Sequence, residues 1–265
     1  MAAVSRASHA AVRPSLLLRY CTWRLYWSII LPRKESPGQG TTGKAMMKVS
    51  VLIPAYNEED TLEEVIRRVR EVALDKEIIV VDDCSTDTTP DILSSLKRDE
   101  LVVLTHSTNR GKGAAVRTAL AAATGDAVII QDADLEYDPR DFEKLLIPFV
   151  EQGARVVYGV RPLQEQTRLM RLGNRLLTGV TNLLYGADLE DMETCYKLIS
   201  KDIIDGLRLR AKGFEIEAEL TAKILKSGHR IHQVPIWYSP RVEKKLTPLD
   251  GLPTLWTLVK LRFAD

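Results

Sequence analysis

The sequence predicts an α/β protein with a mostly parallel sheet flanked by helices. Short apolar runs alternate along the chain with segments whose apolar residues recur every three or four positions. This alternation is typical of strands joined by right-handed helical crossovers. Of the 265 residues, 45% are hydrophobic and 28% are charged, a composition that allows a sizeable core. The sequence has no run of about 18 apolar residues, so we expect no transmembrane helix.

Net charge and cysteine content exclude several function classes. The formal net charge is +1, which gives no global attraction to nucleic acid, and we expect no nucleic-acid partner. Cys21, Cys84 and Cys195 are odd in number, far apart and outside any CxxC pair. This argues against a disulfide framework or a zinc site and favours a reducing compartment, so we expect a cytoplasmic location.

Residues 1–45 differ from the rest of the chain. Their basic residues are opposed by the single acid Glu35. Three interpretations remain open: an organelle transit peptide, a membrane-surface helix, or upstream sequence that is not translated. We favour the last, because Met46 and Met47 directly precede the first strand. The predicted organisation is therefore a basic N-terminal extension, 1–45, disordered or not translated, and a folded domain, 46–265.

Three units of strand, polar loop and helix begin the folded domain. We expect strands at Val49–Pro54, Glu77–Val81 and Leu101–Thr105. The first helix carries Leu62, Val65, Ile66, Val69 and Val72 at helical spacing, with Asp60 or Thr61 placed to cap it. The second helix starts at Pro90, and the third, rich in alanine, follows Gly113 and stops at Gly125.

The fourth strand, Ala127–Ile130, leads into Asp132 and Asp134. An apolar run of this kind is typical of a buried parallel strand, and ligands of open α/β sheets bind at the carboxyl ends of such strands. Hard divalent cations prefer oxygen ligands. Two carboxylates one residue apart therefore predict a site for a divalent cation that carries a diphosphate.

The second half of the domain departs from this regular alternation. We expect helices at Asp141–Gln152, Leu169–Tyr185 and Phe214–Lys226, and strands at Arg155–Val160, Cys195–Ile199 and around Val234. An acidic loop spans Asp188–Glu193. On the terminal helix we expect one apolar face to pack on the domain, or alternatively to lie on a bilayer or a partner; this face comprises Leu252, Leu255, Trp256, Val259 and Phe263.

Four loops together resemble glycosyltransferase family 2, which has the GT-A fold, a Rossmann-like mostly parallel sheet flanked by helices. The likeness covers Lys48 to about Phe263 and is closest to the dolichol-phosphate mannose synthase and polyprenyl-phosphate glycosyltransferase group. It rests on Ile53-Pro54-Ala55-Tyr56-Asn57-Glu58, Val81-Asp82-Asp83-Cys84-Ser85-Thr86-Asp87, Asn109-Arg110-Gly111-Lys112-Gly113 and Asp132-Ala133-Asp134.

The resemblance implies a nucleotide-diphosphate sugar donor, a polyprenyl phosphate acceptor, Mg²⁺ or Mn²⁺, and peripheral contact with the cytoplasmic face of a membrane. Asp132 and Asp134 would serve the metal, and Arg161 would lie near the phosphates. The resemblance also implies a set of donor-binding residues: Pro54, Tyr56, Glu58, Val81, Asp83, Asp132, Ala133, Arg241 and Lys245.

The acceptor prediction also has a chemical argument. A phosphate monoester has its second pKa near ~6 and is already a nucleophile at neutral pH, so it needs cations rather than a general base. Arg168, Arg171 and Arg175 share one helical face, and we expect Arg171 and Arg175 to hold the acceptor phosphate while the hexose is transferred with inversion. A sugar hydroxyl acceptor is the alternative, with a base from the acids of Asp191–Glu193 or from Glu217.

Departures from the group leave the donor sugar open between mannose and glucose. Glu136 follows Asp134-Leu135 where a relative carries Gln or Ser, and the segment after Asp191 ends in Cys195-Tyr196-Lys197. A nucleotidyltransferase is a weaker alternative, because Pro54–Glu58 replaces the glycine-rich loop such an enzyme would carry after the first strand. We interpret Gly111-Lys112-Gly113 as a tight turn that brings Lys112 near the substrate, and His106 as structural.

Overall fold

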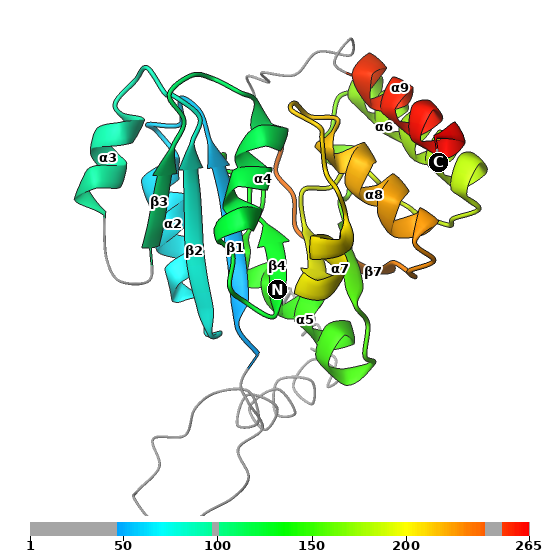
Figure 1. Ribbon diagram of the computed structural model, residues 1–265, viewed down its shortest axis with the longest axis horizontal. Coiled ribbons are helices and arrows are strands. Elements are labelled where there is room, and N and C mark those ends of the chain that lie inside the picture. The colour runs from blue at the N-terminus through cyan, green and yellow to red at the C-terminus, as the bar shows by residue number, and fades with distance from the viewer. Residues whose placement is uncertain (1–46, 97–100, 242–250, 265) are drawn as a thin grey trace, which may run out of the picture. The chain divides into compact units, whose positions relative to one another are not determined.

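The computed structural model describes residues 47–96, 101–241 and 251–264 (Figure 1). The predicted extension, 1–45, and Lys245 lie outside these ranges, so both predictions stay predictions. Within the described ranges, the chain folds around one sheet with helices packed on it.

The sheet is seven-stranded, in the order β3-β2-β1-β4-β6-β5-β7. All pairings are parallel except those of β6, which is antiparallel to both β4 and β5. The predicted mostly parallel sheet is therefore confirmed, with one strand that inverts its direction. The strands are β1 Val49–Ala55, β2 Lys76–Asp82, β3 Leu101–Thr105, β4 Ala127–Ile130, β5 Val156–Val160, β6 Lys197–Ser200 and β7 His232–Pro235.

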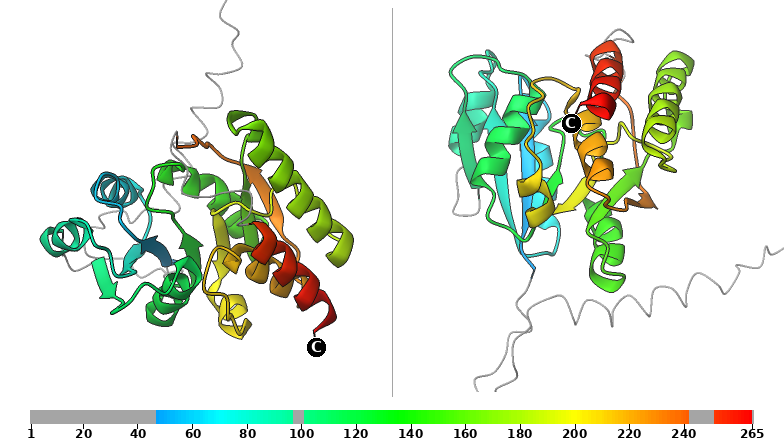
Figure 2. Two further views of the ribbon diagram at one scale, coloured as in Figure 1. Left: turned by 90° about the horizontal axis from the view of Figure 1, so that it is seen from above. Right: turned by 45° about the vertical axis from the view of Figure 1, so that its right-hand side comes forward.

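The helices form two groups. Helices α2 to α5 follow the strands of the first half, whereas α6, α8 and α9 lie together beside the β5–β7 end of the sheet (Figures 1 and 2). The helices are α2 Leu62–Glu71, α3 Thr89–Ser95, α4 Lys112–Ala122, α5 Phe142–Glu151, α6 Arg168–Tyr185, α7 Lys201–Gly206, α8 Ile216–Lys226 and α9 Gly251–Phe263, with short 3₁₀ turns at Pro139–Asp141 and Leu163–Glu165.

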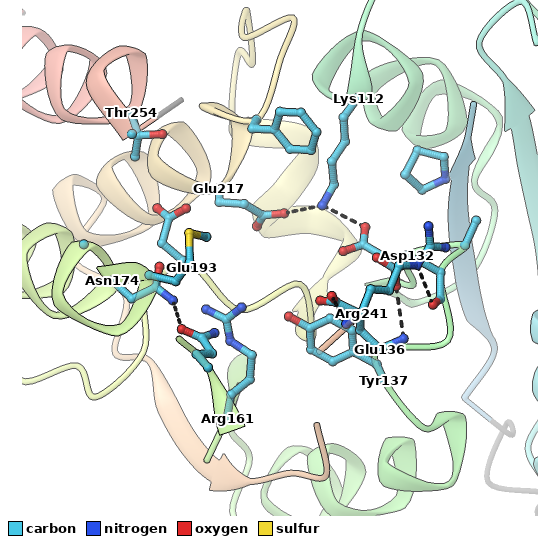
Figure 3. Close-up of a pocket in the computed structure, with 18 of the residues that line it drawn as sticks. Lys112, Asp132, Glu136, Tyr137, Arg161, Asn174, Glu193, Glu217, Arg241 and Thr254 are labelled. Carbon is cyan, nitrogen blue, oxygen red and sulfur yellow. Dashed lines mark hydrogen bonds and ion pairs between the residues drawn. The ribbon is translucent and has the colours of Figure 1, made fainter. Parts of the chain in front are cut away.

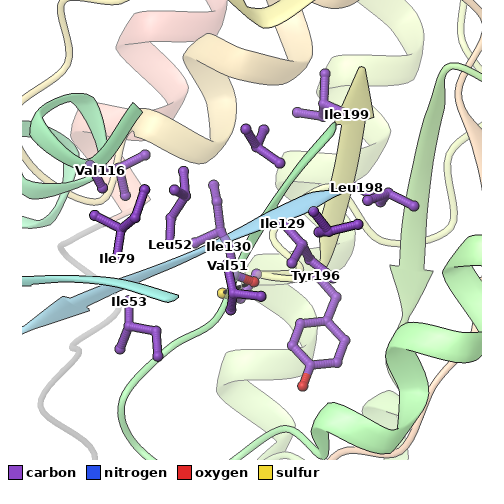
Figure 4. Close-up of a cluster of buried hydrophobic side chains, with 14 of the residues drawn as sticks. Val51, Leu52, Ile53, Ile79, Val116, Ile129, Ile130, Tyr196, Leu198 and Ile199 are labelled. Atoms are coloured by element: carbon purple, nitrogen blue, oxygen red, sulfur yellow. Dashed lines mark hydrogen bonds between the residues drawn. The ribbon is translucent and has the colours of Figure 1, made fainter. Parts of the chain in front are cut away.

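The core lies on both faces of the central strands. Val51, Leu52, Ile129 and Ile130 are almost completely buried (Figure 4), as expected for parallel strands covered on both faces. Each such side chain contributes about 1.5–3 kcal/mol by its burial. A second cluster joins the group of α6, α8 and α9, and it is this cluster that places α6 beside the site described below. Its buried members are Leu177, Leu189, Met192, Ala218, Ala222 and Leu258.

The apolar face predicted to pack α9 on the domain is wrong for three of its five residues. Thr254 and Leu258 are buried instead, whereas Leu252, Trp256 and Phe263 are 60%, 66% and 78% exposed. The helix carries leucines on several sides, so its spacing alone does not single out the packed face. Contact with the second cluster selects Leu258 together with Leu255, and it leaves Leu252, Trp256 and Phe263 at the surface.

Gly125 does not end helix α4, which stops at Ala122. A Cβ at Gly125 would lie 2.8 Å from the Lys48 carbonyl oxygen, and its N–H donates to Ser50 Oγ at 2.9 Å. Glycine is therefore needed here for close approach to β1, which helps to set the register of β4 and of the carboxylates that follow it.

Candidate active site

A cavity of about 580 Å³ opens at the carboxyl ends of β1, β2 and β4 and extends to α6 (Figure 3). Its volume is in the usual range for small-molecule sites. The sheet supplies the polar wall, and α6 supplies a largely apolar wall that includes Leu169, Leu172 and Leu176. Of the residues predicted from the sequence, those that line the cavity are Pro54, Tyr56, Glu58, Asp83, Asp132, Ala133, Asp134, Arg161 and Arg241.

One predicted donor residue, Val81, is not found in the wall. Val81 lies inside β2 with 0% exposure and does not line the cavity. Any part it takes in donor binding would be through its backbone or through packing. Lys245 lies outside the described residues.

Asp83 connects the loops that follow β2 and β3. Its carboxylate accepts hydrogen bonds from the backbone N–H groups of Arg110 (2.9 Å) and Gly111 (2.7 Å) and contacts His106 Nδ1 at 2.6 Å. The other ring nitrogen of His106 lies 2.9 Å from Thr118 Oγ1, so His106 has a structural place. Asp83 thus fixes the start of α4, and its part in donor binding stays a prediction.

A tight turn presents Asp132 and Asp134. Leu135, directly after Asp134, has a positive φ of 59°, which is uncommon for a residue with a side chain. The Thr61 hydroxyl, expected to cap α2, instead donates to the Ala133 carbonyl oxygen at 2.7 Å. These contacts tie the carboxylate turn to the start of α2.

The charges at this turn favour a bound cation. Burial, followed by the negative charges of Asp132 and Glu136, raises the pKa of Asp134 to about 7. Among the described residues, no group of three or more potential metal ligands is found. Two carboxylates fit Mg²⁺ or Mn²⁺, because Mg²⁺ usually takes one or two carboxylates together with substrate phosphates and water.

Arg241 joins three loops at the polar wall. Its Nε donates to the Asp134 carbonyl oxygen at 3.0 Å, its backbone N–H donates to Glu136 at 2.8 Å, and its Nη2 forms an ion pair with Glu58. The predicted donor residues Glu58 and Arg241 and the predicted metal ligand Asp134 are therefore in one contact network. This network holds the segment after β7 against the ends of β1 and β4.

Arg161 forms a buried ion pair with Asp191. Nε and Nη2 of the arginine lie 2.6 and 2.8 Å from the two carboxylate oxygens. Asp191 is 1% exposed, so the partner of Arg161 is a buried acid and not a surface acid. The pair fixes Arg161 at the cavity wall, where the N–H groups not used by Asp191 can bind an anion.

Lys112 lies between two acids of the cavity. Its Nζ is 2.7 Å from Asp132 Oδ1 and 3.2 Å from Glu217 Oε1. Burial lowers the pKa of Lys112, but attraction to Asp132 and Glu217 outweighs this and raises it well above its ordinary value. The expected position near the substrate is consistent with this geometry. The pairing of Glu217 with Lys197 was missed, although a lysine within an apolar strand was a usable signal.

The arginines of α6 do not line the cavity. The α6 residues that do include Leu169, Met170, Gly173 and Leu177, which at about 100° per residue lie on a different side of the helix from Arg171 and Arg175. The expectation that these two arginines hold the acceptor phosphate stays a prediction, and their side of α6 does not line the cavity. Both lie to one side of the exposed leucines Leu169, Leu172 and Leu176.

Glu193 is a further acid in the wall. Burial raises its pKa to about 7, partly offset by the charge of Lys197. Its Oε1 is buried and has no hydrogen-bond partner among the described residues. In the loop predicted to hold a general base, Asp191 is therefore structural, whereas Glu193 has no such pairing within the described ranges and lines the cavity.

Comparisons with solved structures agree with the fold. Glucosyl-3-phosphoglycerate synthase from Mycobacterium tuberculosis, crystallised with Mn²⁺, UDP and phosphoglyceric acid, superimposes with a TM-score of 0.68 at 25% identity. The match covers 89% of this chain and 87% of that one. The predicted GT-A fold is confirmed.

Curated relatives agree with the predicted group. Glycosyltransferase AglJ from Haloferax volcanii is 30% identical over 77% of this chain and 67% of its own length. Dolichol-phosphate mannosyltransferase from Pyrococcus furiosus is 30% identical over 81% of this chain. The chain spans 64% of that relative, and 53% of an undecaprenyl-phosphate 4-deoxy-4-formamido-L-arabinose transferase from an Enterobacter strain.

The family assignment rests on residues 50–206, which match the family model described as "Glycosyl transferase family 2". This segment holds the first six strands of the fold and all four loops that carried the resemblance. The chain is a glycosyltransferase and belongs to glycosyl transferase family 2.

Proposed function

We propose that this glycosyltransferase transfers a hexose from a nucleotide-diphosphate sugar to a polyprenyl phosphate, with inversion at the anomeric carbon. The observation that carries the proposal is the division of the cavity into two unlike walls. One wall presents the carboxylates and cations after β1, β2 and β4, and the other presents the leucines of α6. A donor diphosphate suits the first wall, and an isoprenoid chain suits the second.

The leucines of the apolar wall are more exposed to solvent than a purely structural role would require. Leu169, Leu172 and Leu176 all line the cavity and are 60%, 65% and 60% exposed. Contiguous exposed apolar surface at a cavity is a common mark of a ligand or membrane site. A polar sugar acceptor would leave these leucines in water, whereas an isoprenoid chain would cover them.

The donor would bind with its diphosphate at Asp132 and Asp134. A divalent cation held there would neutralise the charge that develops on the leaving diphosphate. The chain's own cations, Arg161 and Lys112, line the same cavity and can hold phosphate oxygens. The acceptor phosphate needs no base, so the residues have to orient it and exclude water.

Arg171 and Arg175 are suited to contact with the membrane that holds the lipid acceptor. They lie beside the exposed leucines of α6, and an amphipathic helix with a basic side is suited to the surface of an anionic membrane. Leu252, Trp256 and Phe263 of α9 are also exposed. From these exposed apolar residues we infer peripheral contact with the cytoplasmic face of a membrane. The described ranges contain no candidate membrane-spanning helix.

Glu193 favours the alternative acceptor, a sugar hydroxyl. A carboxylate with a pKa of about 7 that lines the cavity is suited to general-base catalysis. The exposed leucines argue for the lipid, and the test must separate the two acceptors. The choice of nucleotide also stays open between UDP and GDP.

The test combines a donor panel with matched acceptors. UDP-glucose and GDP-mannose are offered with Mg²⁺ or Mn²⁺, together with undecaprenyl or dolichyl phosphate, the corresponding polyprenol without phosphate, and free sugars. We expect transfer to the lipid phosphate and none to the polyprenol. Transfer to sugar hydroxyls but not to the lipid phosphate would show that the proposed acceptor is wrong.

A further inference from the structure

Four side chains of alternating charge form a series of contacts that runs from the core to the cavity wall. Lys197 of β6 pairs with Glu217 of α8. Glu217 lies 3.2 Å from Lys112 of α4, and Lys112 lies 2.7 Å from Asp132 (Figure 3). Each inner member contacts two opposite charges. The chain of contacts therefore links a buried strand to a carboxylate of the donor site.

Lys197 is completely buried, which needs an explanation. Its amine contacts Glu217 and the Thr194 carbonyl oxygen, and it lies 4.9 Å from the centre of the Tyr158 ring. Removing an ammonium group from water costs several kcal/mol, and a buried ion pair is often no more stabilising than apolar side chains of the same size. Stability alone does not account for a charged pair at this position.

The backbone around Lys112 is built for close packing. Gly111 has a φ of 87°, and a Cβ there would lie 2.5 Å from the Lys212 carbonyl oxygen. A Cβ at Gly113 would lie 2.7 Å from the Ala211 carbonyl oxygen. Both glycines allow the start of α4 to pack against the segment before α8, and this brings Lys112 within reach of Glu217.

We propose that Lys112 binds the diphosphate of the donor and that the Lys197–Glu217 pair positions Lys112 for this contact. A lysine is a point charge on a flexible stem, so it needs an anchor to be held in one place. Glu217 supplies the anchor. Lys197 balances the charge of Glu217, which leaves the positive charge of Lys112 available to the phosphate oxygens beside Asp132.

This inference rests on the proposed function, and it can be tested without turnover. Isothermal calorimetry with Mg²⁺ compares UDP and GDP with UMP and GMP, which lack the second phosphate. Lys112→Met should weaken binding of the diphosphate about tenfold to a hundredfold, the scale of one charged hydrogen bond, and should change monophosphate binding much less. Lys212→Met, which removes an exposed neighbouring charge, is the matched control and should bind as wild type.

Positioning is tested by a double-mutant cycle. Lys197→Met/Glu217→Gln removes both charges of the pair together, so no buried charge is left without its partner. This variant should bind the diphosphate several-fold more weakly than wild type, while the same two changes in the Lys112→Met background should have no further effect. A thermal unfolding curve checks that each variant is folded.

Three outcomes overturn the inference in different ways. An unchanged ratio of diphosphate to monophosphate affinity in Lys112→Met would show that Lys112 does not bind the second phosphate. If Lys197→Met/Glu217→Gln weakens diphosphate binding equally in the wild-type and Lys112→Met backgrounds, the pair does not act through Lys112. Failure of the wild-type protein to bind any of these nucleotides would contradict the proposed function itself, and the inference with it.

Discussion

Arg161 and Asp191 form a two-point ion pair inside the protein, with N–O distances of 2.6 and 2.8 Å and both residues buried. The pair connects the end of β5 to the acidic loop before β6. It holds one cation at the cavity wall and removes one acid from the set that could act as a base.

Removing one member of this pair should destabilise the protein, whereas replacing both members with apolar residues should not. We expect Asp191→Leu to lower the free energy of unfolding by about 3–5 kcal/mol, because Arg161 is left buried without its partner. Arg161→Met/Asp191→Leu should be close to wild type in stability but lack transferase activity. Urea unfolding measures the free energy of unfolding of both variants. Equal decreases in this free energy for the two variants would contradict the explanation.

Asp134→Asn should leave the fold intact and remove most metal-dependent turnover, because the amide keeps the shape of the side chain but loses its charge. We expect a loss of about a hundredfold or more, the scale of removing one preorganised electrostatic group. Asp188→Asn, an exposed acid on the loop after α6, is the control. Near-normal activity of Asp134→Asn would rule out its assignment to the metal.

Glu193 should make stability depend on pH. Burial raises its pKa from 4.5 to about 7 in the folded protein, so between these values the folded state binds this proton and the unfolded chain does not. Its contribution to stability therefore falls as pH rises from about 4.5 to 7. Glu193→Gln should raise the melting temperature more at pH 8 than at pH 5, and Glu190→Gln, an exposed neighbour, should show no such difference.

The exposed stripe of α9 should bind membranes. Trp256→Ser/Phe263→Ser is expected to weaken sedimentation with phosphatidylglycerol vesicles, since both side chains are mostly exposed and apolar. Val150→Ser, on α5 and 46% exposed, is the matched control. If both variants bind vesicles as wild type does, the stripe is not the membrane contact.

The extension 1–45 should be dispensable for donor binding, because all four loops of the resemblance lie after Met47. A chain that begins at Met46 should fold and bind the donor nucleotide with unchanged affinity by calorimetry. An insoluble product would show that the extension packs on the domain.

The local elements were open to prediction because they depend on short-range patterns. The strands Leu101–Thr105 and Ala127–Ile130 have the predicted bounds, since a buried parallel strand is a short apolar run ended by polar residues. The loops after β1, β2 and β4 converge because the carboxyl ends of parallel strands share one edge. Asp83, Asp132 and Asp134 could therefore be placed at one site from the sequence.

The partners of these residues were decided only by the tertiary structure. The Asp191 partner of Arg161 and the Glu217 partner of Lys197 come from elements 30 and 20 residues away, and no local pattern encodes such pairs. The same holds for α6 and α9, where the apolar spacing allows more than one buried face. Which leucines are buried, and on which side Arg171 and Arg175 then lie, is fixed by packing against α8 and not by the sequence of either helix.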